Sequence, residues 1–127
     1  SKKYVSTNQI GEKVMMKAIL IDPFAETVEV VDYSGDWEDI GGLLDCRYFD
    51  VVRIDDSETL YVDDEGLYAE NQRFFRWDGY HSPLAGRALI LGTDEEGESI
   101  DTDMEPEDVK KLVTFLPEGT GFTLMAV

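Results

Sequence analysis

The apolar residues of this chain fall in short runs of strand length, and each run ends at polar or turn-forming residues. The run MMKAILID (15–22) stops at Pro23, and the segment TVEVV (27–31) places Val28 and Val30 on one face. An Asp-Pro pair favours a turn, because proline presets φ and the aspartate can bond the backbone beyond it. We therefore expect these two segments to form a β-hairpin.

Further strands follow the same pattern. YFDVVRI (48–54) and TLYVD (59–63) flank a polar turn, and RALIL (87–91) is apolar on both faces, as in a central strand. A short strand is predicted over residues 74–77 within an irregular segment. A last strand is predicted over residues 121–127.

Two segments have helical spacing instead. The first, residues 37–44, follows Asp36, a residue type that caps helices. Its predicted apolar side is formed by Trp37, Ile40, Leu43 and Leu44. The second begins at Pro106, because proline suits the first helical position, and is expected to end before Pro117 and Gly119. Its predicted apolar side is formed by Val109, Leu112, Val113 and Leu116.

These elements predict an α+β fold with a mostly antiparallel sheet and two helices packed against it. The length of 127 residues, 43% of them hydrophobic, is typical of one domain with its own core. We interpret residues 1–127 as a single domain and residues 1–14 as a flexible N-terminal extension.

Four segments carry a resemblance to a known family. They are MKAILIDP (16–23), LYVDDEGL (60–67), PLAGRALILG (83–92) and VTFL (113–116). Through them, and through the acidic loop after PLAGRALILG, the chain resembles a family of small acidic proteins of unknown function carried by phages, plasmids and other bacterial mobile elements. The resemblance covers roughly residues 16–116. It implies a mobile-element origin and a cytoplasmic setting, and it supplies no catalytic residues.

Charge is the outlying property of the composition. Asp and Glu number 28 against 11 Lys and Arg, which gives a formal net charge of −17. Such a chain repels nucleic acid and anionic membranes, so we expect neither as a direct partner. The expected partner is a basic protein surface. No apolar run approaches the length of a membrane-spanning helix, and we expect a cytoplasmic protein.

The acidity is concentrated between residues 94 and 108, which include no basic residue. The predicted partner-binding residues are Asp94, Glu95, Glu96, Glu98, Asp101, Asp103, Glu105, Glu107 and Asp108. A domain of this length has a diameter of roughly 36 Å. Duplex DNA of that length carries about 20 charges. The net charge therefore permits nucleic-acid mimicry, while an acidic surface that serves only solubility is the alternative.

A metal site is not expected. One cysteine and one histidine cannot form a Cys/His zinc site within one chain. A calcium loop starting at Asp101 fails, because Pro106 stands where glycine is needed and Leu112 where a bidentate glutamate is needed. No cofactor is expected either.

The segment ENQRFFRWDGYHS (70–82) offers a second candidate site. Its predicted ligand-binding residues are Arg73, Arg76, Trp77 and His81. Aromatic rings stack on bases and guanidinium groups bind phosphate, so a nucleotide-like ligand would suit these residue types. The alternative is that Phe74 or Phe75 and Trp77 fill the core while the arginines pair with surplus carboxylates.

We expect no enzyme. His81 is the single candidate base, and Ser82 beside it lacks a nucleophile elbow. Cys46 is predicted to be a small buried hydrophobic residue at the end of the first helix. A hydrolase using His81 ranks last among the hypotheses. The leading hypothesis is a non-enzymatic mobile-element accessory protein that binds a basic surface of a host or defence protein, in one version by occupying its nucleic-acid site.

Overall fold

A computed structural model describes residues 6–7, 13–66 and 71–119. Two short strands near the N-terminus, β1 (Ser6–Thr7) and β2 (Lys13–Val14), pair in antiparallel orientation. The strand predicted over residues 121–127 and much of the predicted N-terminal extension lie outside the described residues. No helix in the described ranges is long and apolar enough to cross a membrane.

The main sheet has six strands in the order β4-β3-β9-β6-β5, with β10 also paired to β9. All of its pairings are antiparallel, as predicted. The expected hairpin is confirmed, because Met16 faces Tyr33 and Asp22 faces Thr27 across the strands β3 and β4. The strands are β3 (Met16–Asp22), β4 (Thr27–Tyr33), β5 (Phe49–Arg53), β6 (Glu58–Asp63), β9 (Ala88–Thr93) and β10 (Ser99–Ile100).

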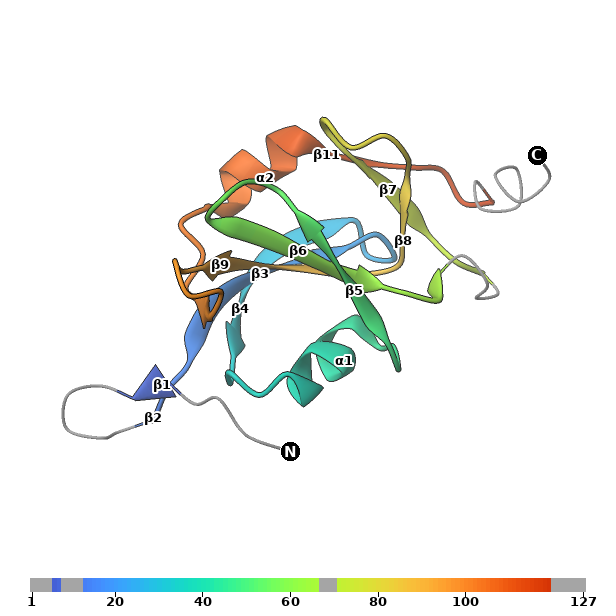
Figure 1. The fold of residues 1–127 in the computed structure, drawn as a ribbon. Helices are drawn as coiled ribbons and strands as arrows, with labels where there is room; N and C mark the ends of the chain where they lie inside the picture. Colours follow the sequence, from blue (N-terminus) through green and yellow to red (C-terminus); the bar gives the residue numbers. More distant parts are fainter. Residues whose placement is uncertain (1–5, 8–12, 67–70, 120–127) are drawn as a thin grey trace.

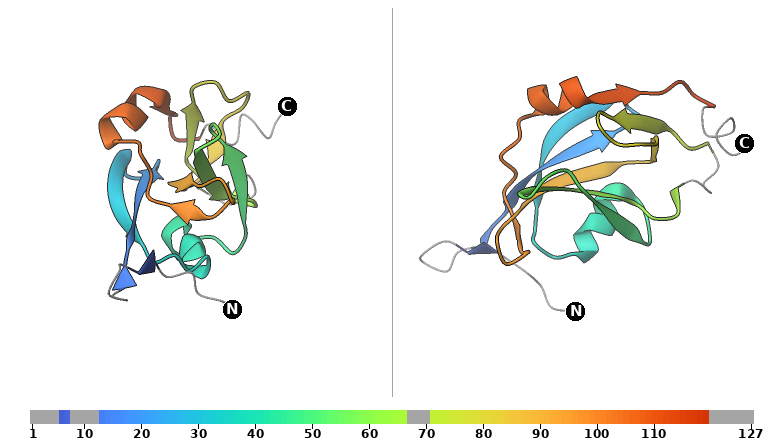
Figure 2. Two further views of the ribbon diagram at one scale, coloured as in Figure 1. Left: turned by 60° about the vertical axis from the view of Figure 1, so that its left-hand side comes forward. Right: turned by 45° about the horizontal axis from the view of Figure 1, so that its top comes forward.

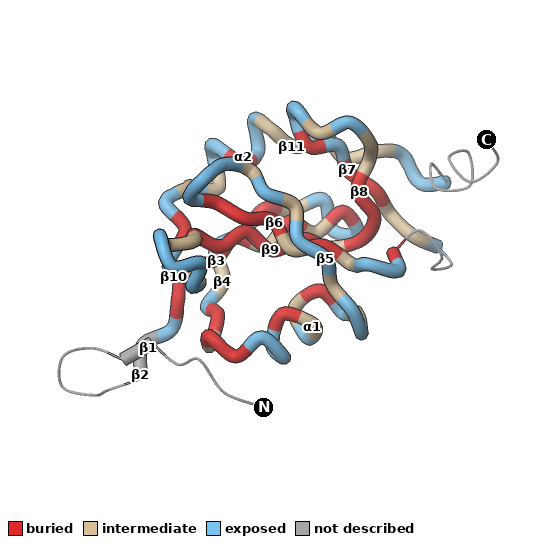
Figure 3. Tube along the Cα trace, viewed as in Figure 1, coloured by how far each residue is buried: buried red, intermediate tan, exposed pale blue. Residues whose placement is uncertain are grey.

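Strand β9 occupies the centre of the sheet, as its uniformly apolar sequence predicts. Ala88 and Ile90 face one core cluster, whereas Leu89 and Leu91 face the other, and all four are fully buried. This alternation follows from the two-residue period of a strand. Both faces of the sheet are therefore covered, and burial is concentrated along β3, β9 and β6 (Figure 3).

The two helices lie on opposite faces of this sheet (Figures 1 and 2). Helix α1 (Glu38–Leu44) buries Ile40 and Leu44 against the lower face in Figure 1. Helix α2 (Pro106–Leu112) buries Val109 against the upper face. The predicted α+β class, with two helices packed on a mostly antiparallel sheet, is confirmed.

A second sheet of order β11-β7-β8 shares the upper face with α2. Its strands are β7 (Phe74–Trp77), β8 (Leu84–Ala85) and β11 (Val113–Phe115). The prediction that the second helix continues to Leu116 is wrong, because Val113–Phe115 pairs with β7 as a strand. The valine, threonine and phenylalanine there favour extended backbone, and pairing with Trp77, Arg76 and Phe75 overrides the helical spacing.

Helix α1 differs from prediction in one side chain that matters below. Asp36 was predicted to cap this helix, but the N-cap position belongs to Trp37, and Asp36, one residue earlier, accepts a hydrogen bond from the Glu38 amide at 3.1 Å through Oδ1. Trp37, however, is 49% exposed and does not join the buried side of the helix. Its backbone already has helical dihedral angles, with φ of −58° and ψ of −24°, so only its place ahead of the first full turn separates it from the buried residues. Cys46 is half-buried, not fully buried as predicted.

Candidate protein-binding surface

The acidic segment 94–108 contains regular structure within residues 94–103, where a loop was predicted. It contains β10, which folds back on β9 through a tight turn. In that turn the Oδ1 atom of Asp94 accepts hydrogen bonds from the amides of Glu96 at 3.0 Å and Glu98 at 2.8 Å. Gly92 allows the close approach behind the turn, because a Cβ atom there would lie 2.4 Å from the carbonyl oxygen of Asp101. The turn therefore presents its carboxylates from a fixed backbone.

A buried glutamate anchors the middle of the segment. Glu58, at the start of β6, is 4% exposed. Its carboxylate accepts hydrogen bonds from the hydroxyl of Thr102 and, at 3.1 Å, from the amide of Asp103. The Thr102 hydroxyl in turn accepts from the Met104 amide at 3.1 Å. This network ties residues 102–104 to the main sheet.

Lys17 holds the same segment from β3. Its amide donates to Oδ1 of Asp101 at 2.9 Å, and its carbonyl accepts from the Thr102 amide at 3.0 Å. Its ammonium group forms an ion pair with Glu105 at 2.6 Å. Two of the nine predicted residues are therefore engaged by Lys17.

The turn between β5 and β6 lies beside this segment at the left of Figure 1. The carbonyl of Ser57 accepts a hydrogen bond from the Thr93 amide at 2.8 Å. In the same turn the backbone amide of Ser57 bonds the carboxylate of Asp55 and lowers its pKa. We call this end of the molecule, made of residues 55–58 and 94–108, the acidic end.

Most carboxylates of segment 94–108 are exposed and unpaired. Six of these side chains form neither a hydrogen bond nor an ion pair with any described residue. They are Glu95, Glu96, Glu98, Asp103, Glu107 and Asp108. The acidity is not confined to this end, since Asp63 is the last residue of β6 and Asp64 and Glu65 follow it at the far end of that strand. The described residues hold no cluster of three or more His, Cys, Asp or Glu side chains arranged to bind a metal.

Of the four predicted ligand-binding residues, only Arg76 and Trp77 line one common hollow, whereas Arg73 and His81 are not part of it. Arg73 forms an ion pair with Glu26 at 3.2 Å, and Trp77 is buried in the core. Arg76 is exposed and lines a hollow of about 450 Å³ together with Lys111. His81 is exposed and its ring lies 4.5 Å from that of Tyr80. Phe74, Phe75 and Trp77 fill the core, as the alternative interpretation expected.

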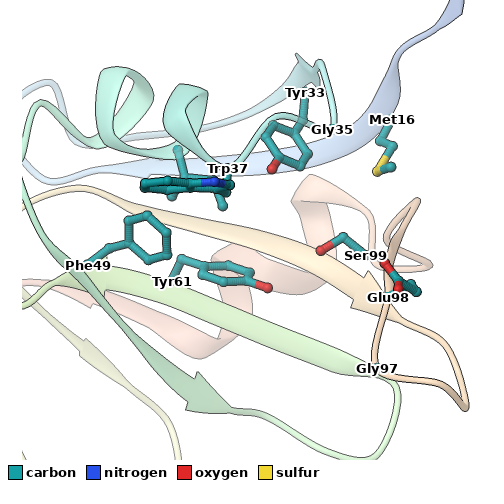
Figure 4. Close-up of a pocket in the computed structure, with 10 residues that line it drawn as sticks. Met16, Tyr33, Gly35, Trp37, Phe49, Tyr61, Gly97, Glu98 and Ser99 are labelled. Carbon is teal, nitrogen blue, oxygen red and sulfur yellow. The ribbon is translucent and has the colours of Figure 1, made fainter. Parts of the chain in front are cut away.

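The structure also contains an aromatic pocket that the sequence did not indicate (Figure 4). This pocket, of about 450 Å³, lies between α1, the strands β5 and β6, and the β9–β10 hairpin. Its ring-bearing residues are Tyr33, Trp37, Phe49 and Tyr61. The Phe49 ring lies 6.3 Å from Trp37 and 5.7 Å from Tyr61, the latter edge-on. Gly97, Glu98 and Ser99 of the acidic end close one side.

Tyr33 is the most buried of the four ring-bearing residues of the pocket. The residue is 2% exposed, and within the described part of the chain its hydroxyl has no hydrogen-bond partner. Burial raises the pKa of this hydroxyl well above its usual value, and Tyr61, Asp36 and Asp39 raise it further. The Tyr33 hydroxyl therefore stays protonated, in surroundings of negative potential.

Comparisons with known proteins connect this fold to a family. The uncharacterised protein y4iR of Sinorhizobium fredii is 35% identical over 72% of this chain, and the chain covers 58% of that protein. Protein PsiB of Rhizobium leguminosarum bv. phaseoli is 38% identical over 43% of this chain, which covers 41% of PsiB. The solved structures gave no significant match. The family model for a domain of unknown function, DUF3846, matches residues 16–114, and the chain belongs to that family.

Proposed function

We propose that this protein is a non-enzymatic binding protein whose acidic end contacts a basic surface of another protein. One observation carries the proposal: six exposed carboxylates of segment 94–108 have no partner among the described residues. The backbone beneath them is held by Asp94, Glu58 and Lys17. Because the scaffold is ordered in advance, binding would cost little backbone ordering.

The setting that we propose is a bacterial mobile element, with a host or defence protein as the partner. The support is the resemblance of the sequence to proteins carried by such elements. Nucleic-acid mimicry is the narrower version of the proposal. Carboxylates also lie beyond the far end of β6, so the negative charge is spread over both ends of the main sheet and does not form one continuous stripe along the acidic end.

The test compares two variants with the same loss of charge. The first neutralises the six unpaired carboxylates of the acidic end to Asn or Gln. The second neutralises six exposed carboxylates elsewhere, namely Glu29, Asp32, Asp50, Asp64, Asp78 and Glu118. Tagged forms capture proteins from bacterial lysate, the captured proteins are identified, and one is purified for affinity measurements.

We expect the native protein and the second variant to retain a basic protein that the first variant loses. The affinity should fall steeply with salt, because the contacts are between exposed charges. Competition by duplex DNA for the purified partner would support mimicry. The proposal is contradicted if both variants lose the captured protein equally, or if the affinity for the purified partner does not change with salt concentration.

A second candidate function follows from the hollow beside β7. Arg76 and Lys111 line it with Tyr80 and one carboxylate, Asp78, and the two cations and the ring suit a small nucleotide-like anion. A nucleotide that saturates the hollow at 100 times its dissociation constant should stabilise the fold by about 2.7 kcal/mol. A thermal-shift series with nucleotides, repeated on Arg76→Ala, measures this. The absence of any shift would eliminate this candidate.

A further inference from the structure

We propose that the aromatic pocket receives an arginine side chain of the basic partner, an inference that rests on the proposed function. The pocket joins the acidic end directly, because Glu98 belongs to both. A partner positioned on the unpaired carboxylates would therefore bring its own cationic side chains to the mouth of the pocket.

The chemistry of the lining favours a cation. Trp37, Phe49 and Tyr61 present rings around one space, and the faces of aromatic rings attract cations, tryptophan most strongly. No lysine or arginine is among the described lining residues, whereas Glu98 stands at the rim. Trp37 is 49% exposed, which is unusual for the largest apolar side chain and leaves its ring available to a ligand.

The polar groups of the pocket favour a guanidinium group in particular. Figure 4 shows the hydroxyl of Tyr33 directed into the space that Trp37, Tyr61 and Ser99 bound. Tyr33 is almost fully buried as a residue, yet its hydroxyl opens into the pocket (Figure 4) and has no partner among the described residues, so it is an acceptor that a ligand can bond. Guanidinium is planar, stacks on rings, and carries five N–H donors that can reach a hydroxyl and a carboxylate together.

The size of the pocket agrees with this occupant. Pockets that bind small molecules measure about 300–1,000 Å³, and this one measures about 450 Å³. One arginine side chain fits in such a volume. The pocket would thus add a specific contact to an interface that is otherwise a general attraction between charges.

The test uses N-acetylarginine amide as the probe and N-acetylcitrulline amide as its neutral counterpart of the same shape. The readout is the indole N–H signal of Trp37 in a ¹H–¹⁵N NMR titration. The chain has two tryptophans, and the indole of buried Trp77 serves as the internal control. We expect a saturable shift of the Trp37 signal with the arginine probe and about tenfold weaker binding of the citrulline probe.

Two variants place the binding in the pocket. Trp37→Ala removes an exposed ring, and Tyr33→Phe removes only the hydroxyl; each should weaken binding of the arginine probe about tenfold. For Trp37→Ala, whose indole reporter is gone, the Tyr33 ring signals follow the titration. No saturable response, or equal responses to both probes, overturns the inference. Tighter binding of putrescine than of the arginine probe also overturns it, because a free amine would then be the better occupant.

A further variant distinguishes failure of the pocket from failure of the proposed function. It neutralises Glu95, Glu96, Asp103, Glu107 and Asp108 and leaves Glu98 intact. We expect it to bind the arginine probe within threefold of the native affinity and to lose capture of the partner. If Trp37→Ala captures the partner as well as the native protein does, the pocket inference fails and the proposed function stands. If the native protein captures no basic partner, the proposed function fails even where the probe binds.

Discussion

Replacing Glu58 with alanine tests whether a buried carboxylate holds the acidic end to the sheet. Glu58 accepts hydrogen bonds from the Thr102 hydroxyl and the Asp103 amide. Hydrogen bonds to charged groups contribute about 1.5–3 kcal/mol each, and Thr102 is only 3% exposed, so its hydroxyl would lose its acceptor without gaining water. Relief from burying a carboxylate offsets part of the loss. We expect the free energy of unfolding to fall by about 3 kcal/mol.

Urea unfolding measures this change. With a slope of about 2 kcal/mol per molar urea, the midpoint should fall by about 1.5 M. Glu29→Ala on β4 is the matched control, because Glu29 is exposed, and it should change the free energy of unfolding by less than about 0.5 kcal/mol. Glu58→Gln keeps the shape and one acceptor oxygen and should cost about 1 kcal/mol.

A double-mutant cycle with Thr102→Val isolates the interaction itself. Because the two side chains share one hydrogen bond, the double variant should lose at least about 1 kcal/mol less than the sum of the single variants. Strict additivity, or a loss below about 0.5 kcal/mol for Glu58→Ala, would refute the anchoring role. Partner capture by Glu58→Ala should also weaken, since residues 102–104 lose their attachment to β6.

Three other substitutions or conditions give independent checks. Gly92→Ala should destabilise by at least about 3 kcal/mol in urea unfolding, because its Cβ would lie 2.4 Å from the Asp101 carbonyl oxygen. Asp45→Gly should stabilise by about 0.5 kcal/mol, because Asp45 ends α1 with φ of 56°. Burial, followed by Asp63 and Asp45, raises the pKa of Cys46 from 9.0 to about 11. Alkylation of Cys46 at pH 8 should therefore be about 100-fold slower than that of a free thiol. The pKa of the Cys46 thiol is higher in the folded than in the unfolded protein. The contribution of the protonated thiol to the free energy of unfolding is therefore present below pH 9 and is lost as the pH rises towards 11.

Local signals in the sequence were sufficient to predict the strands β3, β4 and β9. The Asp22-Pro23 turn and the alternation after Thr27 specify the β3–β4 hairpin, and the uniformly apolar run before Gly92 specifies the buried position of β9. In each case one residue pattern determines both the element and the face that it buries. No distant residue has to be known for either prediction.

Where two patterns compete, the sequence alone was insufficient. Val113 and Leu116 continue the helical spacing of α2, yet pairing with β7 makes residues 113–115 a strand. Strand β10 has only two residues and exists because Ser99 and Ile100 pair with β9. Its apolar content is too small to give a local signal. Both elements are determined by pairing with a strand elsewhere in the fold. The residue pattern within a short window of sequence carries no information about that pairing.

For the candidate site, too, the contiguous features could be predicted from the sequence and the contacts between distant residues could not. The carboxylates of segment 94–108 are a contiguous feature and could be identified from the sequence. Their support could not, because Lys17 and Glu58 lie far away in the chain. The aromatic pocket was missed for the same reason, since Tyr33 and Tyr61 come from strands that are not neighbours in the sheet.

The two proposed contacts should act on different steps of binding. Exposed carboxylates act over about a Debye length and mainly accelerate encounter, so neutralising them should lower the association rate and its dependence on salt. A side chain seated between Trp37 and Tyr33 contacts only over short range, so losing it should mainly raise the dissociation rate. The shared residue Glu98 then predicts a mixed effect on both rates. If Trp37→Ala instead lowered the association rate alone, the ring would belong to the encounter surface, and the pocket would not be the place where the complex is held.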